Sequence, residues 1–270
     1  MPSFAFWNIN RKDLNAATRS LVEAKNLDVL LLCEPDGDPD ELIVGLNELD
    51  QGLYYRVPVL APRFQVYTRL MNEFIRPRFD GPRCSVLTIS IPGIPPFNLM
   101  LIHANCANYH SDQNIALELI EIAKQLRLIE SEDGHTRSIV VGDFNQNPYS
   151  TGLLAANGFH AIMDAAEARK GSRIVQQKPW DYFYNPMWSL MGDRSKGPPG
   201  THFYRGNGLV EQQWHMLDQV IVRPSLLEFF DLEKLEILTA LGKLPLLTAS
   251  NRPRRSDLSD HLPIYFELNT

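Results

Sequence analysis

The residues best suited to chemistry are oxygen-bearing side chains at or near the ends of strand-like segments. Asn8 ends an apolar segment at the start of the chain, and Glu34 directly follows the apolar run 28–33. Similar places later in the chain hold further acids and amides, namely Asp143, Asn145, Asp218 and Asp260. Because α/β folds place ligand sites in the loops at strand ends, we expect these side chains to converge.

Converging carboxylates and amides form an oxygen-rich site that suits Mg²⁺ and Mn²⁺ equally. His261, next to Asp260, could bind or protonate a phosphate oxygen at such a site. Hydrolysis of a phosphodiester requires charge neutralisation at the non-bridging oxygens, an aligned water molecule and help for the leaving oxygen. The residue types therefore predict metal-dependent phosphate chemistry.

The elements that must position these residues are short buried strands that alternate with amphipathic helices. Segments 3–9, 28–33 and 138–142 are apolar runs typical of strands covered on both faces. Helices are expected over 11–25, 39–49, 111–130 and 148–157, and further strands over 63–69, 73–76, 83–91, 97–104, 216–222 and 262–268. This α/β pattern predicts a two-sheet core with helices outside, in a single domain that spans 1–270.

Bulk properties exclude several classes of protein. The chain has 270 residues, 44% of them hydrophobic, and a net charge of −6, which argues against a protein that coats nucleic acid through a broad basic face. Its three cysteines have no C-x-x-C spacing, so we expect reduced thiols and neither a cysteine-based zinc site nor disulfides. No apolar stretch has the length of a membrane span or the form of a leader, so we expect a cytoplasmic protein.

Five short strings resemble, in order, the motifs of the endonuclease/exonuclease/phosphatase superfamily. They are FWNIN at 6–10, LCE at 32–34, GDFN at 142–145, LDQ at 217–219 and SDH at 259–261. The matches cover nearly the whole chain, and GDFN and SDH are the most specific of them. The resemblance implies a divalent-metal-dependent hydrolase of phosphate esters with a four-layer α/β sandwich, in which helices flank two mixed sheets.

The resemblance also implies a role for each residue. Glu34 would be the main metal ligand, helped by Asn8 and Asp260. Asp143 would orient or deprotonate the attacking water, and Asn145 would hold phosphate and water by hydrogen bonds. His261 would stabilise charge on the phosphoryl oxygens, and Asp218 would hydrogen-bond to His261 and keep it cationic.

Two further positions carry weaker signals. His103 ends the strand expected at 97–104, and in several branches of the superfamily a histidine here contacts phosphate or assists the leaving group. Some members pair it with a glutamate, but the matching position here is near Pro62, which offers no carboxylate. Arg83 resembles an arginine that contacts substrate phosphate in some members.

The substrate is less constrained than the chemistry. Arginines lie in the loop before the SDH motif, and aromatic residues lie in a loop-rich insert at about 170–213. They are Arg252, Arg254 and Arg255, and Trp180, Tyr182, Tyr184 and Trp188. These features favour a nuclease that acts on nucleic acid, DNA or RNA. The acidic balance favours the alternative, a phosphatase or phosphodiesterase for a small or lipid-linked ester, and a catalytically inactive binding protein is a third alternative.

Each candidate residue also has a purely structural interpretation. Asn8 could cap the helix at 11–25, Asp143 and Asn145 could be turn residues, and His261 could be a structural histidine. We prefer the functional interpretation because every motif position is filled at once. For the remaining histidines we expect a structural role: His110, His135, His160, His202 and His215.

Overall fold

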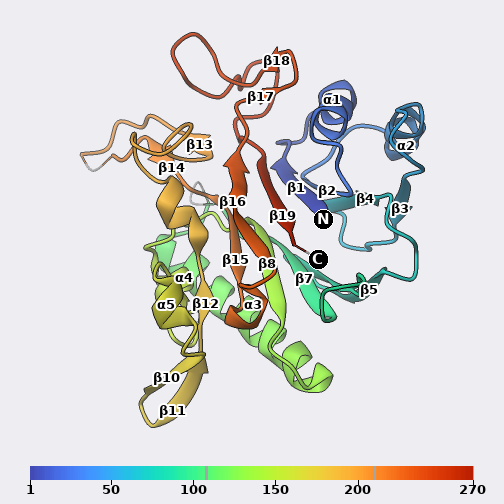
Figure 1. Cartoon of the computed structure of the whole chain (residues 1–270). Coiled ribbons are helices and arrows are strands. Elements are labelled where there is room, and N and C mark those ends of the chain that lie inside the picture. The colour runs from blue at the N-terminus through green and yellow to red at the C-terminus, as the bar shows by residue number, and fades with distance from the viewer. Residues whose placement is uncertain (107–108, 210, 270) are drawn as a thin grey trace.

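Two mixed β-sheets form the centre of the molecule in the computed structural model, which describes residues 1–106, 109–209 and 211–269. The first sheet has six strands in the order β16-β19-β1-β2-β4-β3. Their bounds are Phe230–Ile237, Ile264–Leu268, Ser3–Asn8, Val29–Cys33, Phe64–Thr68 and Tyr55–Val57. Only the β1–β2 pair of this sheet is parallel. Helices α1 (Asn15–Lys25) and α2 (Pro39–Asn47) lie beside this sheet (Figure 1).

The second sheet has seven strands in the order β5-β6-β7-β8-β15-β12-β9. Their bounds are Ile75–Asp80, Cys84–Ile89, Phe97–His103, Ser138–Asp143, Asp218–Val222, Phe183–Tyr184 and Ala161–Ile162. Helix α3 (Asp112–Asp133) and the short α4 (Thr151–Leu154) pack on it, and α5 covers Ala165–Ala168.

The two sheets share one core, and strand periodicity explains how. In β8, Ile139 and Val141 join the core that contains both sheets, whereas Val140 joins the cluster under α3. Successive side chains of a strand point to opposite faces, so a strand covered on both sides needs apolar residues at every position. The continuous apolar run 138–142 therefore predicted its own burial, and the two-sheet α/β sandwich confirms the expected fold class.

Several expected elements need correction at their ends. The helix expected over 11–25 begins only at Asn15, because Asn10 and Arg11 adopt left-handed backbone angles that a helix cannot include. The helix expected over 148–157 shrinks to α4, and the strand expected over 73–76 is displaced to β5. Ser111 caps α3, accepting a hydrogen bond from the backbone N–H of Asn114.

Small hairpins decorate the two ends of the sandwich. The insert expected at about 170–213, of which residue 210 lies outside the described residues, contains the β10–β11 hairpin (Ser172–Val175 and Lys178–Asp181), β12, the 3-10 helix Pro186–Leu190 and β13 (His202–Phe203). Strand β13 pairs with β14 (Trp214–His215), and β17 (Ala240–Leu241) pairs with β18 (Leu244–Pro245). Figure 1 shows β10–β11 projecting from the lower end and the other two hairpins at the upper end.

A buried ion pair fastens α3 to the end of β15. The side chains of Glu130 and Arg223 are each at most 3% exposed, and two hydrogen bonds of 2.8 and 2.7 Å join them. A third nitrogen of Arg223 donates to the carbonyl of Tyr182 at 3.0 Å. None of the helices in the described ranges is both long and apolar enough to cross a lipid bilayer.

Candidate active site

The predicted site residues meet at one edge of the sandwich. Parallel strands β1 and β2 end there with Asn8 and, one residue later, Glu34, and the parallel β7 and β8 end there with His103 and Asp143. Strands β15 and β19 run antiparallel to their neighbours, so they begin at the same edge. In the sheet register Asp218 stands directly opposite Asp143. The acidic residues lie at or near strand ends in the sequence, and the sheet topology places these strand ends next to one another.

Two of these residues, which follow the ends of β2 and β8, adopt left-handed backbone conformations. Glu34 and Asn145 have φ angles of 51° and 48°, which few residues other than glycine adopt. Such backbone conformations cost of order 1–3 kcal/mol and persist only where the surroundings enforce them. Here the backbone N–H of Glu34 donates to the carbonyl of Arg63 at 2.9 Å, and the carbonyl of Glu34 accepts from Arg11 at 2.9 Å. These contacts hold the Glu34 turn in place.

The carboxylate of Asp143 accepts hydrogen bonds from two other site residues. The Nδ2 of Asn8 donates to one carboxylate oxygen of Asp143 at 2.9 Å, and the backbone N–H of Asn145 donates to the other at 2.9 Å. Asp143 is 1% exposed, and this burial raises the pKa of its carboxyl group against the opposing pull of His261. The structural interpretation of Asn8 as a helix cap is wrong, because Leu14 occupies the cap of α1.

Asp218 and His261 form a buried hydrogen-bonded pair. The Nδ1 of His261 lies 2.8 Å from Oδ2 of Asp218, and neither residue is more than 9% exposed. Burial lowers the pKa of His261, but the carboxylates of Asp218, Asp143 and Asp260, Asp218 above all, together outweigh burial and raise this pKa to about 10. The imidazole is therefore cationic at neutral pH, with Nδ1–H directed to Asp218 and Nε2–H left for another partner.

The predicted metal ligands lie beside this cluster. Asn10 donates its Nδ2 to Oδ1 of Asp260 at 2.8 Å, and its backbone N–H donates to Oδ1 of Asn8 at 3.0 Å. Glu34 lies 3.3 Å from Nη2 of Arg11, and its side chain is 15% exposed. Two carboxylates and one amide oxygen are hard donors, so the predicted set of Glu34, Asp260 and Asn8 fits a hard divalent cation.

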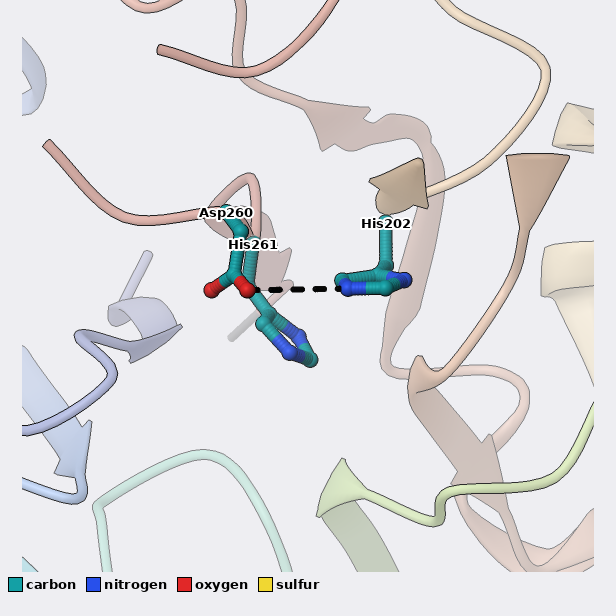
Figure 2. Close-up of side chains that lie close together, drawn as sticks. All are labelled: His202, Asp260 and His261. Carbon is teal, nitrogen blue, oxygen red and sulfur yellow. Dashed lines mark ion pairs between the residues drawn. The ribbon is translucent and has the colours of Figure 1, made fainter. Parts of the chain in front are cut away.

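Two other groups of side chains have the spacing of metal ligands. They are Asp143, Asp218 and His261, and His202, Asp260 and His261, and in each the ligand atoms lie within 4.8 Å of one another. His202 had been expected to be structural. Figure 2 shows its imidazole directed at Asp260, with the ring of His261 close by.

His103 has an arginine beside it where some superfamily members have a carboxylate. Nη1 of Arg63 lies 3.3 Å from Nδ1 of His103, and a guanidinium can only donate, so Nδ1 must accept. The proton of the neutral ring is then on Nε2, which lies 3.9 Å from both Glu34 Oε1 and Asp143 Oδ2. Burial, assisted by Arg63 and Arg83, lowers the pKa of His103 to about 4.

Sequence reasoning missed Arg63, because its place in the site depends on the pairing of two strands. Strand β4 pairs with β2, with Phe64 opposite Cys33, so the residue before β4 must lie beside Glu34. Reading the pairing of the two strands would have placed Arg63 in the site. Its guanidinium also lies 3.8 Å from the carboxylate of Glu34.

The backbone of Arg83 supports the site residue His103. The N–H of His103 donates to the carbonyl of Arg83 at 2.9 Å. The side chain of Arg83 is hydrogen-bonded to Asn105 and lies 3.6 Å from Glu118. Its guanidinium is thus engaged by a carboxylate and an amide, and its phosphate-binding role stays a prediction.

The arginine loop before the SDH motif divides into two kinds of contact. Arg254 is held by a local ion pair with Asp257. Arg252 packs its guanidinium over the ring of Phe203 in β13, 4.5 Å from the ring centre. Since β13 also carries His202, Arg252 lies near the site while Arg254 supports the loop itself.

One of the aromatic residues of the insert, Trp180, lies far from the site. Trp180 lies on the β10–β11 hairpin, and the guanidinium of Arg127 stands 5.4 Å from its ring. Its neighbour Asp181 lines a surface pocket together with Thr136, which precedes the start of β8, whereas Asp143 ends that strand. Trp180 therefore lies at the opposite end of the sheet from the site, as Figure 1 also shows for its hairpin.

Comparison with known proteins yields structural matches only. No protein-family model and no curated protein matches the chain. The endonuclease domain of TRAS1, a telomere-specific non-LTR retrotransposon, matches over 99% of this chain and 98% of its own, with 12% identity and a TM-score of 0.52. Truncated Caenorhabditis elegans TDP2 matches over 100% and 97%, with 15% identity and a TM-score of 0.56.

A third match is the 3′ phosphatase NExo from Neisseria, solved with a product DNA hairpin. It matches over 100% of both chains, with 15% identity and a TM-score of 0.55. These likenesses span whole chains and establish the fold: the protein has the α/β sandwich of endonuclease/exonuclease/phosphatase enzymes. The resemblance noted in the five sequence motifs is confirmed at the level of the fold.

Proposed function

We propose that this endonuclease/exonuclease/phosphatase fold is a divalent-metal-dependent phosphoesterase that hydrolyses phosphodiester bonds in nucleic acid. The observation that carries the proposal is the buried Asp218–His261 pair, held 2.8 Å apart beside the carboxylate of Asp143. A protein that only binds its partner has no reason to keep Asn145 together with the Asp218–His261 pair. His261 and the neighbouring Asp143 supply an acid and a base at one place.

The base in this proposal is Asp143. Burial raises the pKa of its carboxyl group, so the carboxylate accepts a proton from water more readily than an exposed aspartate does. Asn8 and the backbone N–H of Asn145 each occupy one carboxylate oxygen and fix the plane of the group. This orientation determines where the attacking water must lie.

The positive charge in this proposal comes from His261. With Nδ1 bound to Asp218, its Nε2–H is free to donate to a non-bridging phosphoryl oxygen. The side-chain amide of Asn145 uses one N–H for the carbonyl of Ala104 at 3.0 Å, which leaves its second N–H to donate to phosphate and its Oδ1 to accept from water. Charge that develops on the phosphoryl group is thereby met by a preorganised donor.

Glu34 and Asp260, with the amide oxygen of Asn8, would hold the divalent cation. A cation bound there supplies charge neutralisation at the phosphate. Arg11 and Arg63 already partner the Glu34 carboxylate, at 3.3 and 3.8 Å.

Nucleic acid is favoured as the substrate by two considerations. The structural neighbours include a retrotransposon endonuclease domain and a phosphatase solved with a DNA hairpin. In addition, Arg252 lies over Phe203 near the site, where its charge could meet a phosphate. The net charge of −6 favours the second candidate, a phosphatase or phosphodiesterase for a small or lipid-linked phosphate ester.

A substrate panel tests the proposal. The full chain would be assayed with Mg²⁺ or Mn²⁺ on single- and double-stranded DNA and RNA, abasic and 3′-blocked DNA, nucleotides, inositol phosphates and sphingomyelin. The Asp143→Asn variant, purified in parallel, controls for contaminating nucleases. We expect cleavage of an oligonucleotide that Asp143→Asn lacks.

Two results would change the conclusion. Faster hydrolysis of inositol phosphates or sphingomyelin than of any oligonucleotide would replace nucleic acid with the second candidate. If no substrate is hydrolysed above the level of Asp143→Asn, the protein is no phosphoesterase and the interpretation as an inactive binding protein stands.

A further inference from the structure

Two imidazoles and a carboxylate converge beside the proposed catalytic pair. Nε2 of His202 lies 3.7 Å from Oδ2 of Asp260, and the rings of His202 and His261 are 4.7 Å apart between centres. One ligand atom from each of the three residues falls within 4.8 Å of the others. Figure 2 shows the His202 ring reaching across toward Asp260, above the ring of His261.

This donor set differs from the oxygen set predicted for Mg²⁺. Imidazole nitrogens suit Zn²⁺ and its neighbours in the transition series, whereas Mg²⁺ prefers carboxylate, carbonyl and water oxygens. Two histidines with one carboxylate are a known ligand set of zinc, and they leave a fourth position for water. The cluster therefore discriminates between metals by donor type.

His261 is already arranged as a metal ligand. Histidines that bind metals almost always donate their other ring N–H to a carboxylate, which fixes the ring and raises its basicity. The Nδ1 of His261 makes this contact with Asp218 at 2.8 Å, so Nε2 is the atom left for a metal. The negative field of Asp218 that favours a proton at Nε2 favours a dication there still more.

The backbone holds His202 in register with His261. The two residues form an antiparallel β-bridge, and the N–H of Leu262 donates to the carbonyl of Thr201 at 2.8 Å. The side chains of His202, Asp260 and His261 are 16%, 27% and 10% exposed, so the cluster is reached from solvent. A ligand set with fixed backbones and an open side has little ordering entropy to lose on binding a metal.

We propose that His202, Asp260 and His261 bind Zn²⁺, and that zinc bound there inhibits the enzyme. Zn²⁺ takes the place of the proton on Nε2 of His261, and that proton is released to solvent. Inhibition, which rests on the proposed function, follows because zinc occupies His261 and the Asp260 carboxylate that the hard cation needs. Zinc binding itself does not depend on the proposed function.

Zinc binding is measured by equilibrium dialysis of the metal-free full chain against Zn²⁺, followed by metal analysis. We expect one Zn²⁺ per chain, and binding weaker by at least about tenfold in His202→Ala, since loss of even a supporting contact costs 10–100-fold at metal sites. His215→Ala is the matched control, because it removes an imidazole from the same hairpin, 6.4 Å from the His202 ring, and leaves the three ligands intact. Its affinity for Zn²⁺ should equal that of wild type.

Equal zinc affinity in wild type and His202→Ala would overturn the proposal, as would equal losses in His202→Ala and His215→Ala. X-ray absorption of the wild-type zinc form adds a measurement that needs no variant, and fewer than two imidazoles around zinc would also refute the site. Inhibition is tested in the Mg²⁺-dependent assay, where His202→Ala should require at least about tenfold more Zn²⁺. If zinc binds as described but no substrate is hydrolysed, the metal site stands and the proposed function fails.

Discussion

Removing the charge of Asp218 should weaken the proposed enzyme by discharging His261. The Nδ1–Oδ2 distance of 2.8 Å and the full burial of Asp218 make this carboxylate the main cause of the raised pKa of the imidazole. In Asp218→Asn the ring stays in place, but the negative partner is gone. We therefore expect an enzyme that folds and binds substrate but loses turnover.

The magnitude follows from the pKa of His261. A rise from 6.5 to about 10 corresponds to roughly 5 kcal/mol in favour of the protonated ring, so the wild-type ring is almost entirely cationic at pH 7.5. If Asp218→Asn returns the pKa toward 6.5, roughly one ring in ten remains cationic at pH 7.5, and kcat/KM falls about tenfold or more. His261→Ala removes the donor altogether and should cost about 10²–10⁴.

The pH dependence of kcat/KM shows whether the lost charge of His261 causes the loss of activity in Asp218→Asn. A raised pKa means that the active, protonated form persists below the folded pKa and disappears as pH rises through it. The basic limb of kcat/KM should therefore lie near pH 10 in wild type and move toward 6.5 in Asp218→Asn. His135→Ala, which removes a half-buried imidazole from the pocket at the opposite end of the sheet, is the control and should leave the profile unchanged.

A variant with both Asp218→Asn and His261→Ala shows whether the two residues act as one unit or independently. Because Asp218 acts through His261, the double variant should be little worse than His261→Ala alone. Strictly multiplicative losses would refute this reasoning. So would a His261→Ala enzyme within a few-fold of wild type, or a basic limb that does not move in Asp218→Asn.

Three further predictions concern the metal, the substrate and the fold. Excess EDTA should abolish activity, and full activity in EDTA would exclude the metal. Glu34→Gln should raise the Mg²⁺ concentration needed for half-maximal rate, whereas the control Glu48→Gln, on the exposed end of α2, should not. Replacing the three arginines of loop 252–255 by alanine should raise KM more than it lowers kcat and flatten the dependence of log KM on log salt; an unchanged slope would remove this loop from the substrate site. Arg223→Met should lower the free energy of unfolding by about 3–5 kcal/mol in urea titration because Glu130 is left buried and unpaired; a cost below about 1 kcal/mol would show that water reaches the carboxylate.

Much of the site was predictable from the sequence because its residues are attached to strand ends. The apolar runs before Glu34 and Asp143 identify buried strands, and parallel strands end at a common edge of their sheet. Sequence order and residue type were therefore enough to predict that the five motifs converge. The catalytic and metal-binding roles of these residues stay predictions that the experiments above test.

The partners of the site residues were not predictable from local patterns. Arg63 and His103 are 40 positions apart, and only the pairing of β4 with β2 brings the arginine to the site. His202 lies on a strand of two residues, too short to show any periodicity, and its place beside His261 depends on a single β-bridge. Composition likewise does not show where the β10–β11 hairpin with Trp180 projects.

The two histidines beside Asp143 differ in charge, and we infer that this difference leaves one acid, His261, and one base, Asp143, at the site. At neutral pH His261 is cationic, with a pKa of about 10, whereas His103, with a pKa of about 4, is neutral. A second imidazolium would lower the pKa of Asp143 and weaken it as a base. Burial keeps His103 neutral, and Arg63 contributes, because its positive charge disfavours the imidazolium and its N–H fixes Nδ1 as an acceptor. His103 is thus left to donate a neutral N–H from Nε2, 3.9 Å from the Asp143 carboxylate, and we infer that the site contains one charged dyad and not two.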